Sequence, residues 1–189
     1  MRKAFVSVLL LVALSACAQQ RVLLGHQAPA TWADEPGGYE RGRVVDVVDG
    51  DTADVRITSV VDGPGAGDTR VGKSYRVRFL GIDTPESVKL GTPVQCFARA
   101  ASAATKALLL GRTVRLVKDV EEADQYGRLL RYVYFGHEMA NARLVANGYA
   151  RVLTYPPNVR HAQLFVVLQQ QAREHDRGLW SPESCNGRR

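Results

Sequence analysis

Three short segments combine acidic and basic side chains in a way that suits chemistry at a phosphate: residues 47–52 (VVDGDT), 78–86 (RFLGIDTPE) and 124–134 (DQYGRLLRYVY). Carboxylate and carbonyl oxygens are the ligands that Ca²⁺ prefers. Guanidinium groups offer paired donors to phosphate oxygens, where negative charge gathers during phosphoryl transfer. If the fold brings the segments together, they indicate cation-assisted chemistry at a phosphate.

The acidic residues of the first two segments meet if their strands form a hairpin. Residues 52–60 and 73–82 carry the β-branched and alternating apolar side chains that are typical of strands. Pairing them about the middle of the intervening loop places Asp51 beside Asp83. Adjacent carboxylates repel each other unless a cation lies between them. We therefore predict a Ca²⁺ site made of Asp51, Asp83 and the carbonyl group of Thr84. Without the second segment, the first would fit a simple Asp-Gly turn.

Two arginines and a glutamate complete the candidate site. Arg78 lies in the same strand as Asp83 but would face the opposite side, so a bulge or twist must re-aim it. The alternative is a solvated strand arginine. Pro85 disfavours helix at the residue before it, so the segment that carries Glu86 leaves the strand in a turn. The alternative to a catalytic role for Glu86 is a helix-capping or merely exposed carboxylate. Arg128 follows a glycine in the third segment.

Five strands and three helices must position these residues. The patterns predict strands at residues 43–48, 52–60, 73–82, 113–118 and 130–135. They predict helices at residues 97–110, 141–147 and 158–176. This order fits an α+β fold, an OB-type five-stranded β-barrel with three packed helices, a fold whose face commonly binds oligonucleotides. We assign it to one domain, residues 42–189.

The N-terminal residues have the pattern of an export signal. Two basic residues precede an apolar run and small residues, which is typical of a bacterial secretory signal at residues 1–16. Residues 14–17 (LSAC) form a lipobox-like pattern, which predicts lipidation of Cys17; the alternative is ordinary cleavage after Ala18. Residues 17–41 are rich in Gln, Ala, Pro and Gly and predict a flexible tether. We expect an exported, membrane-anchored lipoprotein of the bacterial envelope, or a secreted protein if Cys17 is not lipidated.

Length and charge set broad limits on function. A chain of 189 residues has room for one domain of ordinary size. Lys and Arg number 25 against 19 Asp and Glu, a formal net charge of +6. This excess favours a polyanionic partner through long-range attraction, although many basic exported proteins bind no nucleic acid.

Taken together, the three segments resemble the signature segments of the staphylococcal nuclease family, in the same order and across residues 43–181. The resemblance implies a calcium-dependent phosphodiesterase that hydrolyses DNA and RNA, cuts the phosphorus to 5′-oxygen bond and leaves 3′-phosphates. Arg78 and Arg128 match the catalytic arginines of the family. Glu86 matches the residue that activates or orients the attacking water. We expect a monomer that prefers single-stranded substrate.

The resemblance also suggests substrate contacts and a disulfide. Tyr126 and Tyr155 would line the nucleotide pocket, or they could pack on the barrel. Exported relatives often carry one cysteine before the first helix and another after the last tryptophan, which pairs Cys96 with Cys185; two unrelated thiols are the alternative. The chain departs from the staphylococcal protein at Gln125, where that nuclease has a lysine, and in a longer hairpin loop, which we expect to be mobile and non-catalytic.

Two other functions fit parts of the sequence. A non-catalytic OB module could bind single-stranded nucleic acid or a protein, and some relatives are degenerate in this way. A lipoprotein with an unrelated envelope role is favoured only by the anchor. The complete set of catalytic residues favours the enzyme, because a binding module need not keep it.

Overall fold

The computed structural model describes residues 35–86 and 94–188. The predicted signal peptide, Cys17 and most of the predicted tether lie outside the described residues. The first strand begins at Tyr39, before the predicted domain start at residue 42. No helix in the described part of the chain is long and apolar enough to cross a membrane.

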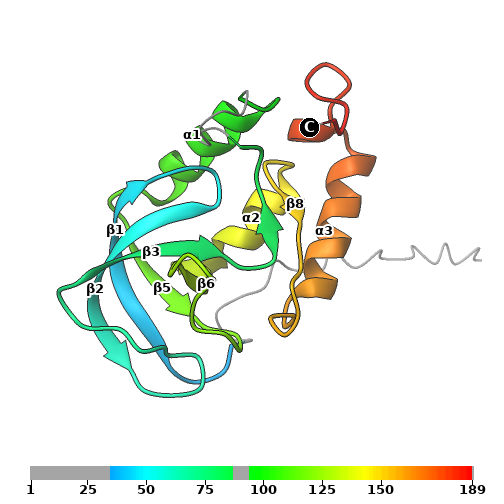
Figure 1. Cartoon of the computed structure of the whole chain (residues 1–189). Helices are drawn as coiled ribbons and strands as arrows, with labels where there is room; N and C mark the ends of the chain where they lie inside the picture. Colours follow the sequence, from blue (N-terminus) through cyan, green and yellow to red (C-terminus); the bar gives the residue numbers. More distant parts are fainter. Residues whose placement is uncertain (1–34, 87–93, 189) are drawn as a thin grey trace, which may run out of the picture.

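Within the described residues, five strands close a barrel and a short sixth strand extends its sheet (Figure 1). The strands of this sheet are β1 (Tyr39–Val47), β2 (Thr52–Val61), β3 (Ser74–Phe79), β5 (Thr113–Val117), β6 (Leu129–Phe135) and β7 (Glu138–Met139). Their order is β3-β2-β1-β5-β6-β7, and a parallel pairing of β3 with β6 closes the barrel. The predicted five-stranded barrel is confirmed.

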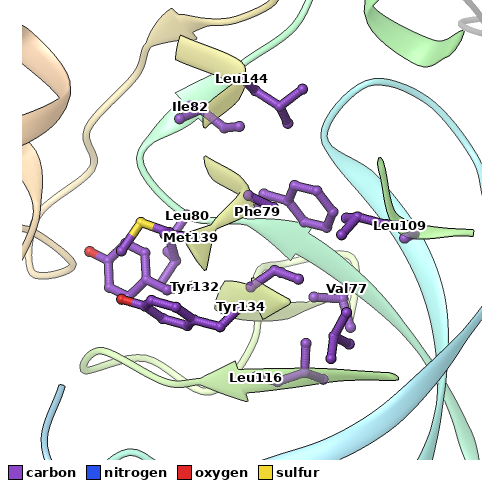
Figure 2. Close-up of a cluster of buried hydrophobic side chains, with 14 of the residues drawn as sticks. Val77, Phe79, Leu80, Ile82, Leu109, Leu116, Tyr132, Tyr134, Met139 and Leu144 are labelled. Carbon is purple, nitrogen blue, oxygen red and sulfur yellow. The ribbon is translucent and has the colours of Figure 1, made fainter. Parts of the chain in front are cut away.

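Alternation along the strands builds the core. In β2, Val55 and Ile57 are buried while Arg56 between them is exposed, as expected for a sheet with one face in the core. Figure 2 shows side chains of β3, β5 and β6 packed in the interior, together with Leu109 and Leu144 from two helices. Burial of this apolar surface supplies the main favourable free energy of folding.

The three predicted helices are confirmed, with shifted ends, within the described residues: α1 (Ala98–Leu109), α2 (Ala140–Ala146) and α3 (Ala162–Glu174). A 3₁₀ turn, η2 (Gly178–Trp180), follows them. Helices α2 and α3 lie on the side of the barrel away from β2 (Figure 1). Helix α3 begins later than predicted because residues 155–161 form turns, with a cis bond between Pro156 and Pro157.

The predicted strand 73–82 is wrong in its extent, and the predicted register is wrong as well. Strand β3 ends at Phe79, and after a turn the chain forms a separate short strand, β4 (Ile82–Asp83), which pairs with β8 (Arg151–Val152). In the β2–β3 hairpin, Thr52 lies opposite Arg78. The break lies at Gly81, which has φ +75°, and a Cβ there would lie 2.4 Å from the ring of Phe165.

The long β2–β3 connection is fastened to the barrel, which differs from the mobile loop that we expected. Gly65 is buried; its N–H donates to the carbonyl of Gly37 (3.0 Å), and its own carbonyl accepts from the N–H of Lys118 (2.8 Å). The N–H of Gly67 donates to Oε1 of Glu40 (3.0 Å). The loop thus packs on the ends of β1 and β5.

A buried ion pair lies beneath this loop. The side chains of Arg131 and Glu40 are both 0% exposed, and Nη2 of Arg131 lies 2.8 Å from Oε1 of Glu40. Arg131 also donates to the carbonyl of Glu122 (2.9 Å) and to its carboxylate (2.5 Å). Burial alone would lower the pKa of Arg131, but the hydrogen bonds and charges of the two glutamates outweigh it and raise this pKa. The guanidinium group therefore stays charged in the interior.

A disulfide joins Cys96, just before α1, to Cys185, after η2, across a sequence separation of 89 residues. It ties the start of α1 to the C-terminal segment. Closing so long a loop restricts the unfolded chain and is worth about 4–5 kcal/mol in the chain-entropy model.

We expect Glu40→Gln to lower the free energy of unfolding by about 3–5 kcal/mol, because it leaves the buried charge of Arg131 short of a partner. Glu122→Gln is the matched control: its carboxylate binds the same guanidinium group but is 35% exposed, so we expect a loss below about 1 kcal/mol. Urea unfolding of both variants measures the difference. Equal losses would mean that burial of the Glu40 pair does not determine its contribution.

Candidate active site

The acidic turn between β1 and β2 is held against two other elements. Oδ1 of Asp49 accepts the N–H of Asp51 (3.0 Å), and the carbonyl of Gly50 accepts the hydroxyl of Thr105 in α1 (2.6 Å). A Cβ on Gly50 would lie 2.6 Å from the Oγ1 of Thr84. The turn therefore needs glycine at its centre, because the segment after β4 packs directly on it.

Asp51 contacts residues from several segments of the site and is 4% exposed. Its Oδ2 accepts both the backbone N–H of Thr84 (2.7 Å) and the Thr84 hydroxyl (3.0 Å). Its Oδ1 accepts the hydroxyl of Thr52 (3.1 Å) and lies 3.3 Å from Nε of Arg78. The carboxylate thus fixes the backbone of Thr84 next to an arginine at the end of β3.

Arg78 lies between the two predicted metal-binding carboxylates. Its Nη2 is 3.4 Å from Oδ1 of Asp83, and its Nη1 donates to the carbonyls of Phe79 (2.9 Å) and Ile82 (2.8 Å). The predicted strand pairing of Asp51 with Asp83 is wrong, because Asp51 lies opposite Phe79 instead. The turn after β3 brings Asp83 back to Arg78, and this reversal also removes the opposite-face difficulty.

Negative charge accumulates at this end of the barrel. Burial, and next the charge of Asp51, raise the pKa of Asp49 to about 6. The donor atoms are all oxygens, which suits a hard cation such as Ca²⁺. Within residues 35–86 and 94–188, no three His, Cys, Asp or Glu side chains converge as a complete ligand set. The carbonyl oxygen of Thr84 and oxygens of substrate or water would complete the coordination. The residues present fit a site of this kind.

The second arginine is held by its own turn. Oδ2 of Asp124 accepts Nε of Arg128 (2.6 Å), while Oδ1 accepts the backbone N–H groups of Tyr126 (3.0 Å) and Arg128 (3.0 Å). Burial would raise the pKa of Asp124, but the hydrogen bonds from Arg128 and the backbone outweigh it and lower this pKa. The guanidinium carbon of Arg128 lies 5.5 Å from the centre of the Tyr126 ring. Asp124 thus orients Arg128.

Glu86 follows Thr84 and Pro85 and is half-buried. Its N–H donates to Oε1 of Gln95 (2.9 Å), and its carbonyl accepts the N–H of Gln95 (3.0 Å). This reciprocal pair holds both ends of the 87–93 segment, whose own placement lies outside the described residues. Glu86 therefore lies at the Thr84 side of the site, and Gln95 is a positioning residue that the sequence analysis missed.

A cleft of about 580 Å³ brings Arg78 and Arg128 together. Leu80 and Leu153 line its apolar floor, while both predicted tyrosines border it. Tyr126 is 75% exposed and Tyr155 67% exposed, so neither ring is buried in the packing of the barrel. The cleft therefore has two arginines and exposed aromatic rings at its edges.

Asn158 forms a second support that the sequence analysis did not identify. It is buried, and its Oδ1 accepts the N–H groups of Val120 (3.1 Å) and Glu121 (3.0 Å). Its Nδ2 donates to the carboxylate of Glu121 (2.7 Å). These bonds join the Tyr155 wall of the cleft to the Asp124 wall. An asparagine directly after Pro-Pro was the available signal, because such residues bind backbone groups in turns.

Comparisons with known proteins agree with this geometry. The family model described as "Staphylococcal nuclease homologue" matches residues 76–182. A thermonuclease of Staphylococcus intermedius is 42% identical over 124 residues, which covers 66% of this chain and 74% of the relative. A thermonuclease of Staphylococcus hyicus is 40% identical, covering 74% of this chain and 75% of the relative. Endonuclease YncB of Bacillus subtilis is 36% identical, covering 58% of this chain and 53% of the relative.

We expect Asp124→Asn to change how stability depends on pH. The lowered pKa of Asp124 means that its contribution is present above the unfolded-state pKa of about 3.9 and is lost as the pH falls through the folded-state value. The variant should therefore be less stable than wild type at pH 7, and the two should converge in strong acid. Urea unfolding from pH 7 to pH 2 measures this, with Asp62→Asn, at an exposed loop residue, as the control. A constant offset at every pH would refute the assigned ionic role.

Proposed function

This chain belongs to the staphylococcal nuclease homologue family, and we propose that it hydrolyses DNA and RNA in a calcium-dependent reaction that leaves 3′-phosphates. It is a nuclease, a hydrolase of phosphodiester bonds. The observation that carries the detailed proposal is the convergence of Arg78 and Arg128 on one cleft, with Asp51 and Asp83 in contact with Arg78 at its edge.

Asp51, Asp83 and the carbonyl of Thr84 would hold the calcium ion, with Asp49 adding negative charge nearby. When bound, the ion supplies positive charge that stabilises the charge developing on the phosphate oxygens. Asp51 is held in position by Thr52 and Thr84, and its Oδ1 would give up the 3.3 Å contact with Nε of Arg78 to serve as a ligand. The contact between Oδ1 of Asp83 and Nη2 of Arg78 is long, at 3.4 Å, and can be exchanged at little cost.

The arginines would bind the phosphate that is cut. Both guanidinium groups line the cleft, and each is oriented by a carboxylate that leaves some N–H groups for a ligand. Donors preorganised in this way stabilise the extra negative charge of the transition state without reorganisation at the moment of reaction. Arg78 would release Asp83 as it takes up phosphate oxygens.

Glu86 would orient the attacking water and accept its proton. The water oxygen forms a new bond to phosphorus while the bond to the 5′-oxygen breaks, so the phosphate remains on the 3′ side. The leaving 5′-oxygen takes up a proton and ends as a hydroxyl. Glu86 suits this role because the Gln95 pair and Pro85 fix its backbone beside Thr84.

Tyr126 and Tyr155 would favour single-stranded substrate. Their exposed rings at the cleft edges can stack on bases, and a base paired in a duplex is not available for such stacking. Tyr126 also lies against Arg128, so a base stacked there would lie close to the phosphate held by that arginine.

The test is incubation of the purified chain with single-stranded DNA in Ca²⁺, in Mg²⁺ and in EDTA. We expect cleavage with Ca²⁺, little with Mg²⁺, which demands stricter octahedral geometry, and none with EDTA. Product ends should carry 3′-phosphates. Arg78→Lys should lose about 10²- to 10³-fold in rate, because a point charge cannot replace paired donors. Arg99→Lys, at an exposed position of α1, is the control. Full activity in EDTA would refute the metal assignment.

We also propose that the enzyme is exported and that Cys17 is lipidated. The support is the sequence pattern of residues 1–17, and the Cys96–Cys185 disulfide fits an oxidising compartment outside the cytoplasm. Cys17→Ser should release the protein from the membrane fraction or block its processing. A mature wild-type protein that begins at Gln19 and carries no acyl groups by mass spectrometry would contradict lipidation.

A further inference from the structure

The outward face of the sheet carries a row of arginines that the catalytic proposal does not use. Alternation places them on the same side of β1, β2, β3 and β5, away from the core, and we call them the arginine face: Arg41, Arg43, Arg56, Arg76 and Arg115. Helices α2 and α3 lie on the other side of the barrel (Figure 1). The side chains of this face are exposed or half-exposed.

Two pairs of these arginines lie directly opposite each other on neighbouring strands. Arg41 of β1 is the partner of Arg115 in β5, and Arg43 of β1 is the partner of Arg56 in β2. Like charges directly opposite in a sheet destabilise it, since their Cβ atoms are only about 4.5–5.5 Å apart. Within the described residues, no carboxylate forms an ion pair with Arg41, Arg43 or Arg56. In the Arg43–Arg56 pair the repulsion is not relieved by a carboxylate, and a polyanionic ligand would relieve it.

The acidic residues of the same face do not neutralise it. Asp46 and Asp54 lie opposite each other at its catalytic end. Asp54 is bound to Arg76 through two hydrogen bonds, of 2.9 and 3.0 Å. This pairing uses two of the five N–H groups of Arg76, whose side chain remains 52% exposed. Arg76 is therefore oriented by Asp54 and keeps donors for another acceptor.

The arginine face is continuous with the candidate active site. Arg76 lies in β3 beside Arg78, on the same side of the strand. A second, open hollow of about 380 Å³ is lined by Arg76 and Tyr75 and shares Tyr126 and Arg128 with the catalytic cleft. The row crosses three strand spacings of about 4.7–4.9 Å each, from β3 through β2 and β1 to β5. Several nucleotides of a single strand would span such a length.

We propose that the arginine face binds the phosphate backbone of the part of a nucleic-acid strand that extends beyond the catalytic cleft. The proposal rests on the nuclease function proposed above. Spaced guanidinium groups on the outer surface of the barrel fit a flexible chain of phosphates, and the continuity with the cleft selects nucleic acid over another polyanionic surface. The face would act on affinity for long substrates and leave the chemical step unchanged.

The experiment uses a double variant that carries both Arg43→Gln and Arg56→Gln. It is compared with wild type and with a matched double control variant. The control combines Arg99→Gln and Lys106→Gln, which removes the same charge from exposed positions of α1. Affinity for a single strand of about 20 nucleotides, longer than the about 4–16 that one OB fold covers, is measured in EDTA over a range of salt concentrations. Cleavage of a dinucleotide and of the long strand is measured in Ca²⁺.

We expect the Arg43/Arg56 variant to bind the long strand more weakly and to lower the slope of log Kd against log salt by about 1.4, or about 0.7 for each lost phosphate contact. Its rate of dinucleotide cleavage should match that of wild type. The control variant should match wild type in every one of these measurements. The thermal midpoint of the Arg43/Arg56 variant should stay the same or rise, because a repulsion is removed. An unchanged slope, or an equal loss with the control variant, overturns the proposal.

Two further outcomes separate the alternatives. If the variant loses binding to phosphatidylglycerol vesicles but keeps its affinity for the long strand, the face is a membrane surface and the proposal is wrong. If wild type cleaves neither substrate in Ca²⁺, the catalytic proposal fails, while the salt slope in EDTA still decides whether the face binds nucleic acid.

Discussion

The break in the strand after Phe79 is the constraint on which the candidate site depends. A continuous strand would carry Asp83 away from Arg78, whereas the turn at Gly81 brings it back within 3.4 Å. The positive φ of Gly81 and its contact with Phe165 of α3 leave no room for a side chain. The carbonyl of Gly81 also accepts the N–H of Leu153 (3.0 Å), which binds the turn to the far wall of the cleft. The helices thus determine the geometry of the site through the backbone of one turn.

A second constraint is electrostatic and lies behind the other wall of the cleft. Arg131 is buried with Glu40 and also binds the backbone and the carboxylate of Glu122. The segment that it fixes continues into Asp124, which in turn orients Arg128. Breaking a buried pair costs several kcal/mol because it leaves a charge without a partner. This cost gives the arginine-bearing turn a defined position, although the turn itself is exposed to solvent.

The barrel and its three helices were predictable from the sequence, because alternation is a local property. The roles given to the site residues came largely from the family resemblance, and they stay predictions. The β2–β3 register was not predictable, because the pairing depends on how the long loop folds onto Gly37, Glu40 and Lys118, which lie outside the hairpin. Gln95 and Asn158 were missed for a related reason. Gln95 bonds the backbone of Glu86 across the 87–93 segment, and Asn158 bonds Val120 and Glu121 much farther along the chain; a single sequence carries little signal for such side chain to backbone bonds.

The strand register determines where the modest net positive charge of this chain lies on the barrel. A total of +6 does not say where the charges lie. The observed pairing places Arg43 against Arg56 and Arg41 against Arg115, and a shift of one residue would have moved these side chains to the core face. Repulsion across such pairs is worth about 0.2–1 kcal/mol each, which is small beside the contribution of a long-loop disulfide or of a buried ion pair. The barrel can therefore tolerate like charges on its open face, and a bound polyanion would turn the same repulsion into attraction, since it supplies the charge that the sheet lacks.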